Sequence, residues 1–265
     1  MNMKSNNVPI GIFDSGIGGT SIWKEITALL PNENTVYLSD SKNAPYGLKS
    51  KQEIINLSVK NTEILLQKKC KLIVVACNTA TTNSIDILRS SYNIPFIGIE
   101  PAIKPAALKT KSNKIGILAT KGTLNSKLFE KTSSSLGKEI RIIETIGENL
   151  VELIEDGRIE SKEMHLLLAK YLTPMLQEGV DCLVLGCTHY PYLIPKIRKI
   201  VGNKIEIIDS GQAVAKQTRA ILEKSNLLNN NKPLGNHQFY INKSKKILDQ
   251  IIPKQNRLKI EEKYF

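Results

Sequence analysis

Two cysteines occupy similar settings in the two halves of the chain. Cys77 lies in KLIVVACNTAT and Cys187 in DCLVLGCTHYP, so each follows a short apolar run and precedes a turn that contains threonine. Such a run predicts a buried parallel strand, and open α/β sheets place their ligands at the carboxyl ends of such strands. Two thiols at two equivalent strand ends suit a reaction that needs a base on each face of one substrate carbon.

The surrounding segments also repeat. PIGIFDSGIGGT (residues 9–20) resembles KIGILATKGT (residues 114–123), and both read as strands that end in a polar loop with glycine. The two cysteines repeat at nearly the same offset as these segments, which predicts two similar lobes. The alternative is that α/β proteins contain many such units and that two of them coincide.

Strand-like runs alternate with helical patterns along the chain, which predicts an α/β fold. We expect two pseudo-symmetric lobes, each a mainly parallel sheet flanked by helices, with the active site in the cleft between them. Strands are predicted at 10–13, 35–39, 72–76, 96–99, 114–118, 139–143, 182–185 and 206–208, and helices at 18–30, 49–68, 84–91, 101–108, 126–136, 162–177, 192–201 and 212–225. The first lobe is expected to comprise 1–100 plus 210–265, and the second 101–209. The tail at 237–265 is expected to form a small addition to a sheet edge.

Composition favours a cytoplasmic enzyme. The chain has 265 residues, 41% of them hydrophobic, and no apolar run approaches the roughly 20 residues of a membrane span. The first residues contain no apolar core of a signal peptide. The four cysteines (Cys70, Cys77, Cys182 and Cys187) are therefore expected to be free thiols, with Cys70 and Cys182 serving as buried core residues.

The formal net charge of +12 raises the question of nucleic-acid binding. The lysines are spread along the chain, and aromatic residues do not interleave with them as in single-strand binders. We therefore expect a solvated basic surface. No Cys-x-x-Cys pair is present, and Cys187 with His189 has only His165 and His237 as further histidines, so no metal site is expected.

Polar residues follow each predicted strand. In FDSGIGG, Asp14 and Ser15 either face a ligand or cap the next helix, and the glycines permit close backbone approach. Tyr46 and Gly47 lie in APYG, which by itself predicts a surface turn. A free thiol has a pKa of about 8.5, so a thiolate needs a nearby cation or helix N-terminus, and His189 is the candidate partner of Cys187.

Taken together, FDSGIGG, SDSKNAPYG, ACNTAT, LATKGT and GCTHYP resemble, in this order, the motifs of glutamate racemases in the aspartate/glutamate racemase superfamily. The resemblance covers about residues 10–215. It implies a cofactor-independent interconversion of L- and D-glutamate that supplies D-glutamate for peptidoglycan. Glutamate is then the small-molecule partner, a homodimer is left open, and no membrane partner is expected.

By the same resemblance, Cys77 and Cys187 are the two proton donors and acceptors, assisted by Asp14 and His189. Glu155 in LVELIEDG is similar to an acid that supports the second-lobe site, although Glu152 stands where the family usually has proline. The substrate-binding positions that match are Asp14, Ser15, Tyr46, Gly47, Asn78, Thr79, Thr120, Thr123, Thr188 and His189.

Other functions remain open at this level. A sister racemase could act on aspartate or a hydantoin, and a related decarboxylase would need only one protonating thiol. A basic regulator that binds nucleic acid or topoisomerase would need neither Cys77 nor Cys187. Two thiols in opposed lobes favour racemisation, because inversion requires one base to remove the α-proton and an acid on the opposite face to return one.

Overall fold

Four central strands of the first lobe form the core of a parallel sheet whose edge is extended by the end of the chain. The computed structural model describes residues 7–137, 139–230, 233–253 and 256–265. Within these ranges the first sheet has the order β10-β9-β2-β1-β3-β4, and every pairing is parallel. Its strands are β1 (Ile10–Asp14), β2 (Thr35–Ser39), β3 (Leu72–Val75), β4 (Phe96–Gly98), β9 (His237–Ile241) and β10 (Leu258–Glu262).

The second sheet repeats the arrangement of the first. Among the described residues it has the order β6-β5-β7-β8, again with all pairings parallel. Its strands are β5 (Lys114–Ala119), β6 (Arg141–Ile146), β7 (Cys182–Gly186) and β8 (Glu206–Ile208). This order matches β2-β1-β3-β4, so β3 and β7, the strands before Cys77 and Cys187, are equivalent. The predicted α/β fold with two pseudo-symmetric lobes is confirmed.

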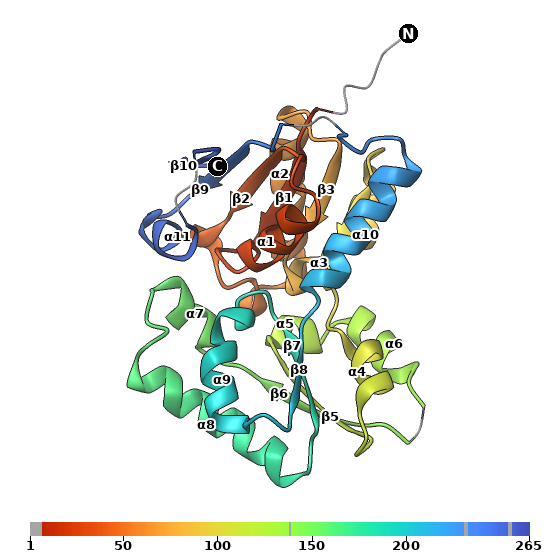
Figure 1. Cartoon of the computed structure of the whole chain (residues 1–265), viewed down its shortest axis with the longest axis vertical. Helices are drawn as coiled ribbons and strands as arrows, with labels where there is room; N and C mark the ends of the chain where they lie inside the picture. The colour runs from red at the N-terminus through yellow and green to blue at the C-terminus, as the bar shows by residue number, and fades with distance from the viewer. Residues whose placement is uncertain (1–6, 138, 231–232, 254–255) are drawn as a thin grey trace.

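Helices cover both faces of each sheet (Figure 1). In chain order they are α1 (Thr20–Leu29), α2 (Lys51–Gln67), α3 (Asn78–Ser91), α4 (Ile103–Lys109), α5 (Lys121–Leu124), α6 (Lys127–Ser134), α7 (Leu150–Glu155), α8 (Lys162–Gln177), α9 (Ile194–Val201), α10 (Gly211–Lys224) and α11 (Lys246–Ile251), with short 3-10 helices η1 (Ser41–Asn43), η2 (Tyr46–Leu48) and η3 (Tyr190–Leu193). Because both faces are covered, strands such as β1, β2, β3 and β7 are buried along their whole length, which explains their continuous apolar runs.

The chain passes between the lobes twice. It leaves the first sheet after β4 and returns after β8, where α10 packs beside α1 of the first lobe (Figure 1). The two passages touch, because Ser210 Oγ donates a hydrogen bond of 2.5 Å to the carbonyl of Glu100. The two covalent connections between the lobes therefore lie side by side.

Several elements differ from the sequence prediction. α3 begins at Asn78, directly after Cys77, and not at Ser84, so the predicted threonine turn is the first turn of a helix. β6 begins at Arg141, two residues later than expected. α5 and α7 were not predicted, since they are short. The tail extends a sheet edge as expected, with β9, β10 and α11.

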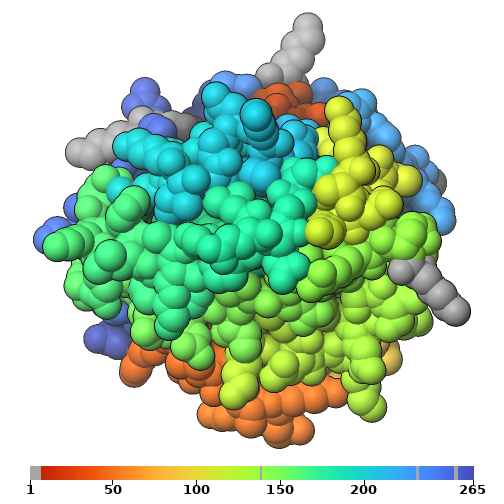
Figure 2. All heavy atoms as spheres, turned by 90° about the horizontal axis from the view of Figure 1, so that it is seen from below, coloured from red at the N-terminus to blue at the C-terminus, as the bar shows by residue number. Residues whose placement is uncertain are grey.

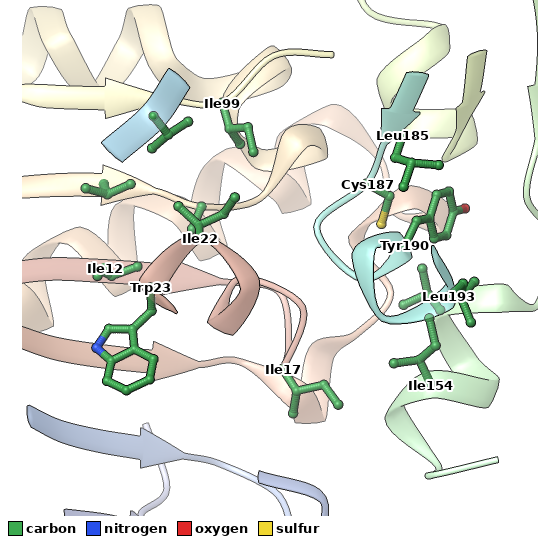
Figure 3. Packing of buried hydrophobic residues seen from close by; sticks show 14 of the residues in the cluster. Ile12, Ile17, Ile22, Trp23, Ile99, Ile154, Leu185, Cys187, Tyr190 and Leu193 are labelled. Atoms are coloured by element: carbon green, nitrogen blue, oxygen red, sulfur yellow. The ribbon is translucent and has the colours of Figure 1, made fainter. Parts of the chain in front are cut away.

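One hydrophobic cluster spans both lobes. On the first-lobe side it includes Ile17 and Ile22, and on the second-lobe side Tyr190 and Leu193, all nearly inaccessible to solvent (Figure 3). Seen from the second-lobe end, that lobe fills the view and segments of the first lobe appear around its rim (Figure 2). The cleft is thus closed by packed apolar side chains around the polar residues described next. Within the described ranges, no helix combines the length and the apolar character needed to cross a bilayer.

Candidate active site

The two cysteines predicted from the sequence line one cavity. Cys77 follows β3 and caps α3, with its sulfur accepting from the Ala80 N–H at 3.4 Å and donating to Ser15 Oγ at 3.5 Å. Cys187 follows β7, and its sulfur lies 3.7 Å from His189 Nδ1. Each lobe therefore contributes one buried thiol from an equivalent strand end.

A narrow cavity of about 10 Å³ lies between the lobes. Ten predicted site residues line it: Ser15, Tyr46, Gly47, Cys77, Asn78, Thr79, Thr120, Cys187, Thr188 and His189. The other three, Asp14, Thr123 and Glu155, lie behind this lining and contact it. Pro45 and Val151 also line the cavity and were missed; Pro45 belongs to the quoted APYG segment, while Val151 belongs to α7, which the sequence did not reveal.

Asn78 carries an unused hydrogen-bonding capacity. Its side chain is almost fully buried and lines the cavity, yet neither its amide nitrogen nor its oxygen has a hydrogen-bond partner among the described residues. An unpaired buried amide is costly, and such groups in native proteins call for a missing partner. A polar ligand in the cavity would supply both a donor and an acceptor.

Asp14 connects the two lobes beneath the cavity. It is fully buried, and its carboxylate accepts from the Gly16 N–H at 2.9 Å and from Thr188 Oγ1 of the second lobe at 3.1 Å. Burial raises the pKa of Asp14 from 3.8 to about 6, and the attraction of His189 and the hydrogen bonds only partly oppose this effect. Asp14 is therefore an anion at neutral pH that can regain a proton in weakly acidic solution.

His189 is paired with Glu155 inside the protein. Its Nε2 lies 2.6 Å from Glu155 Oε1, and both side chains are nearly inaccessible to solvent. Burial lowers the pKa of His189, but the hydrogen bonds to Cys187 and Glu155 and their charges outweigh burial and raise it well above the ordinary value. The Gly18 N–H, 3.2 Å away, could bond to Nε2 only in the neutral ring, so it is left without this acceptor when the ring is charged. We assign the imidazolium form, in which Nε2–H donates to Glu155 and Nδ1–H faces the sulfur of Cys187.

Glu155 also holds the glycine-rich loop of the first lobe. Its Oε1 accepts from the Ile17 N–H at 2.7 Å, and its Oε2 accepts from Ser41 Oγ at 2.7 Å. A Cβ added at Gly16 would lie 1.9 Å from Glu155 Oε1, and one at Gly18 would lie 2.2 Å from His189 Nδ1. Gly16 and Gly18 of FDSGIGG thus leave room for side chains of the second lobe. From the sequence alone, this close contact between the lobes could not be told apart from close approach of the backbone to a ligand.

The environment of Cys77 keeps its sulfur protonated. Burial, and after it the charge of Asp14, raise the pKa of Cys77, and the hydrogen bonds from Ala80 and to Ser15 offset this only in part. The position of Cys77 at a helix N-terminus does not lower its pKa below the ordinary value, in contrast to the general expectation. In the closed cavity, Cys77 is therefore held as a neutral thiol.

Threonines and a tyrosine complete the walls. Thr79 Oγ1 of the first lobe lies 2.8 Å from Thr120 Oγ1 and 3.3 Å from Thr123 Oγ1 of the second. Tyr46 is buried, with its hydroxyl donating to Asp40 Oδ2 at 2.5 Å. The prediction of a surface turn for APYG is thus wrong, because the tyrosine side chain anchors this segment in the core; Gly47 beside it lies close to Thr120.

The remaining cysteines and histidines lie elsewhere. Cys70 and Cys182 are buried among core residues of the two sheets. His165 is exposed on α8, and His237 contacts Thr35 at the far end of β9. Among the described residues, no group of three or more His, Cys, Asp or Glu side chains is arranged to hold a metal ion.

Comparisons with known proteins point to one enzyme family. The sequence profile described as Asp/Glu/Hydantoin racemase matches residues 10–218. A glutamate racemase of Cupriavidus pinatubonensis is 48% identical over 212 residues, which cover 80% of this chain and 78% of that protein. The matched residues include all five of the motifs quoted above, in the same order along the chain.

Two similar solved structures hold a glutamate enantiomer. Escherichia coli glutamate racemase, in complex with L-glutamate and the activator UDP-MurNAc-ala, superimposes with a TM-score of 0.83 at 31% identity, covering 97% of this chain and 98% of that one. Glutamate racemase from Francisella tularensis, in complex with D-glutamate, gives a TM-score of 0.81 at 29% identity, with 97% and 98% covered.

Proposed function

The chain belongs to the Asp/Glu/hydantoin racemase family, and on that premise we propose that it interconverts L-glutamate and D-glutamate by moving the α-proton between Cys77 and Cys187. It is an isomerase that acts on glutamate. The observation that carries the two-thiol assignment is the shared cavity, which receives one cysteine from each of two equivalent strand ends.

In the proposed step, the thiolate of one cysteine removes the α-proton while the thiol of the other donates its own proton to the opposite face of the carbon. The two sulfurs exchange protonation states, and after the product leaves, one sulfur releases a proton to solvent and the other takes one up, so over a full cycle no proton or electron is gained or lost. Opposed bases avoid the alternative of one base crossing the substrate. Burial and then the charge of Asp14 raise the pKa of Cys77, which suits this thiol to donate a proton, and His189 Nδ1 lies 3.7 Å from the sulfur of Cys187.

The substrate is held by neutral donors. Asn78 offers an unpaired amide, and Ser15, Thr79 and Thr188 contribute hydroxyls to the same cavity. We propose that these groups bind the carboxylates of glutamate and stabilise the carbanion-like charge that develops at the α-carbon, since preorganised donors in a site closed to water act strongly on developing charge. Thr120 and Thr123 position Thr79 from across the cleft.

The cellular setting is also a proposal. The family implies that D-glutamate is used for peptidoglycan, hence for cell wall and cell shape. A cytoplasmic location fits four cysteines that are all free thiols. We keep the lobe boundaries at 1–100 plus 210–265 and 101–209, in line with the strands of each sheet. A homodimer is to be tested by light scattering.

One experiment distinguishes a glutamate racemase from a racemase of another substrate. The protein is incubated with L-glutamate in deuterated water, and circular dichroism and α-deuterium incorporation are followed; both are expected to change until the enantiomers are equal. L-Aspartate and a hydantoin serve as competing substrates, and a variant with both Cys77→Ser and Cys187→Ser is the control. Absence of exchange with glutamate, or faster exchange with aspartate, would refute the proposal. A salt-dependent shift of DNA in a gel would favour the basic regulator instead.

A further inference from the structure

The end of the chain reaches the substrate cavity through one buried asparagine. β9 pairs with β2 in parallel, so the residue after each strand lies at the same edge of the sheet as the cavity (Figure 1). Asn242 follows β9, and its N–H donates to the Ser39 carbonyl at the end of β2 at 3.3 Å. The segment beyond the sequence motifs is thereby joined to the strand that leads into APYG.

The nitrogen and the oxygen of the Asn242 side-chain amide each form a hydrogen bond. Its Nδ2 donates to Asp40 Oδ1 at 2.5 Å, and its Oδ1 accepts from the Lys42 N–H at 2.8 Å. The side chain is 5% exposed. The Asp40 carboxylate needs a hydrogen-bond donor, whereas the Lys42 N–H needs an acceptor. Only a side chain that donates on one side and accepts on the other satisfies both. Neither an aspartate nor an apolar residue could replace it there.

Asp40 links Asn242 to the wall of the cavity through hydrogen bonds. Its carboxylate is fully buried, and besides the bond from Asn242 it accepts from Asn43 Nδ2 at 2.7 Å and from the Tyr46 hydroxyl at 2.5 Å. Asn61 Nδ2 completes the group by donating to the Tyr46 hydroxyl at 3.1 Å. Tyr46 lines the cavity that contains Cys77. The path from the tail to the cavity thus consists of two successive hydrogen bonds in a buried network.

We propose that Asn242 is a positioning residue for the substrate cavity: it fixes the Asp40 carboxylate, which in turn holds Tyr46 and the adjoining Gly47 against the second lobe. This inference rests on the proposed function. Gly47 already touches Thr120 across the cleft, since a Cβ there would lie 2.9 Å from Thr120 Cβ. A small displacement of this segment would therefore alter the fit of substrate, while the thiols on other strands keep their places.

The expected signature is a change in KM larger than the change in kcat. Asn242→Ala removes a donor to a buried carboxylate, and we expect KM for both glutamate enantiomers to rise about tenfold while kcat stays within about threefold, the pattern of lost ground-state fit. Asn229→Ala is the matched control. Asn229 is equally buried and donates from its amide to the Asn32 carbonyl, but it lies near the opposite end of β2. That variant should lose stability without a change in KM.

A double-mutant cycle with Tyr46→Phe tests the route. If Asn242 acts through the Tyr46 hydroxyl, Asn242→Ala should raise KM by less than about twofold in the Tyr46→Phe background, because contacting residues are not additive. Equal KM values for Asn242→Ala and Asn229→Ala, or additive effects in the cycle, would overturn the inference. If Asn242→Ala does not fold, Asn242→Ser and Asn229→Ser are compared in the same way. Failure of the unsubstituted protein to exchange the α-proton of glutamate would instead refute the proposed function.

Discussion

Replacing the buried carboxylate of Asp14 should stabilise the protein while removing activity. Burial raises the pKa of Asp14 from 3.8 to about 6, so the folded state holds this proton more tightly than the unfolded state does. Stability is therefore lost as the pH rises from 3.8 to 6, and above pH 6 the full cost of about 3 kcal/mol remains. The amide introduced by Asp14→Asn carries no charge to desolvate, and this substitution should recover most of that free energy.

The geometry allows the amide to keep both contacts. An amide oxygen can accept from the Gly16 N–H as Asp14 Oδ2 does, and an amide nitrogen can donate to the Thr188 hydroxyl, which rotates to accept. The gain in the free energy of unfolding should approach about 3 kcal/mol at pH 7 and fall below about 1 kcal/mol at pH 4, where Asp14 of the native protein is protonated. Urea titrations of both proteins at the two pH values measure this difference.

Asp209→Asn provides a matched control. Asp209 accepts from the Gly211 N–H at 2.7 Å, the same two-residue turn that Asp14 makes with Gly16, but it is exposed to solvent. Its replacement should leave stability within about 0.5 kcal/mol at both pH values. A gain for Asp14→Asn that is absent at pH 7, or that is equal at pH 4 and pH 7, would refute the account of Asp14 as a desolvated anion. Turnover of Asp14→Asn should fall at least about a hundredfold, the usual range for loss of a group in proton transfer.

Four further outcomes are expected. Cys77→Ser and Cys187→Ser should each abolish net racemisation with the fold intact by circular dichroism; near-normal turnover in either variant would exclude the two-thiol mechanism. Glu155→Gln leaves the buried His189 imidazolium without its counter-charge, so urea titration should show a loss of about 3–5 kcal/mol; a loss below about 1 kcal/mol would mean that this pair is not ionised. Dialysis against EDTA, with or without pyridoxal phosphate added afterwards, should leave turnover unchanged, and restoration of lost activity by one metal would contradict this. Asp14→Asn and His189→Asn should impair turnover of the two enantiomers unequally while the equilibrium stays at unity; equal losses in both directions would assign both residues to general binding.

The sequence predicted the parts of the site that depend on local pattern. Cys77 and Cys187 could be placed because each follows a buried strand whose apolar run is visible in about five residues. The start of α3 could not be predicted. Its first turn contains threonines, which have low helix propensity, and its N-cap is Cys77, a residue type that seldom caps helices. Glu155 could be suggested only by resemblance to a family.

Contacts between distant segments lay beyond prediction. The bonds of Glu155 to Ile17 and Ser41 exist only once the lobes dock, and nothing in LVELIEDG specifies them. Asn242 lies in a tail whose strands form by pairing with β2, so its role depends on register between segments that are 202 residues apart in the chain. The sequence pattern therefore predicts strands and their ends better than it predicts which side chains from distant segments contact each other at those ends.

The two covalent connections between the lobes run side by side at Ser210 and Glu100, and this arrangement bears on how the enzyme responds to solvent. Paired passages of this kind define an axis about which two bodies can turn, and admission of substrate requires the lobes to separate. Separation would wet the apolar surfaces of Ile17 and Ile22 and those of Tyr190 and Leu193. Excluded osmolytes such as sucrose favour burial of such surface. Turnover should therefore depend on water activity. Added sucrose should favour the closed protein, slow the release of product and so lower turnover.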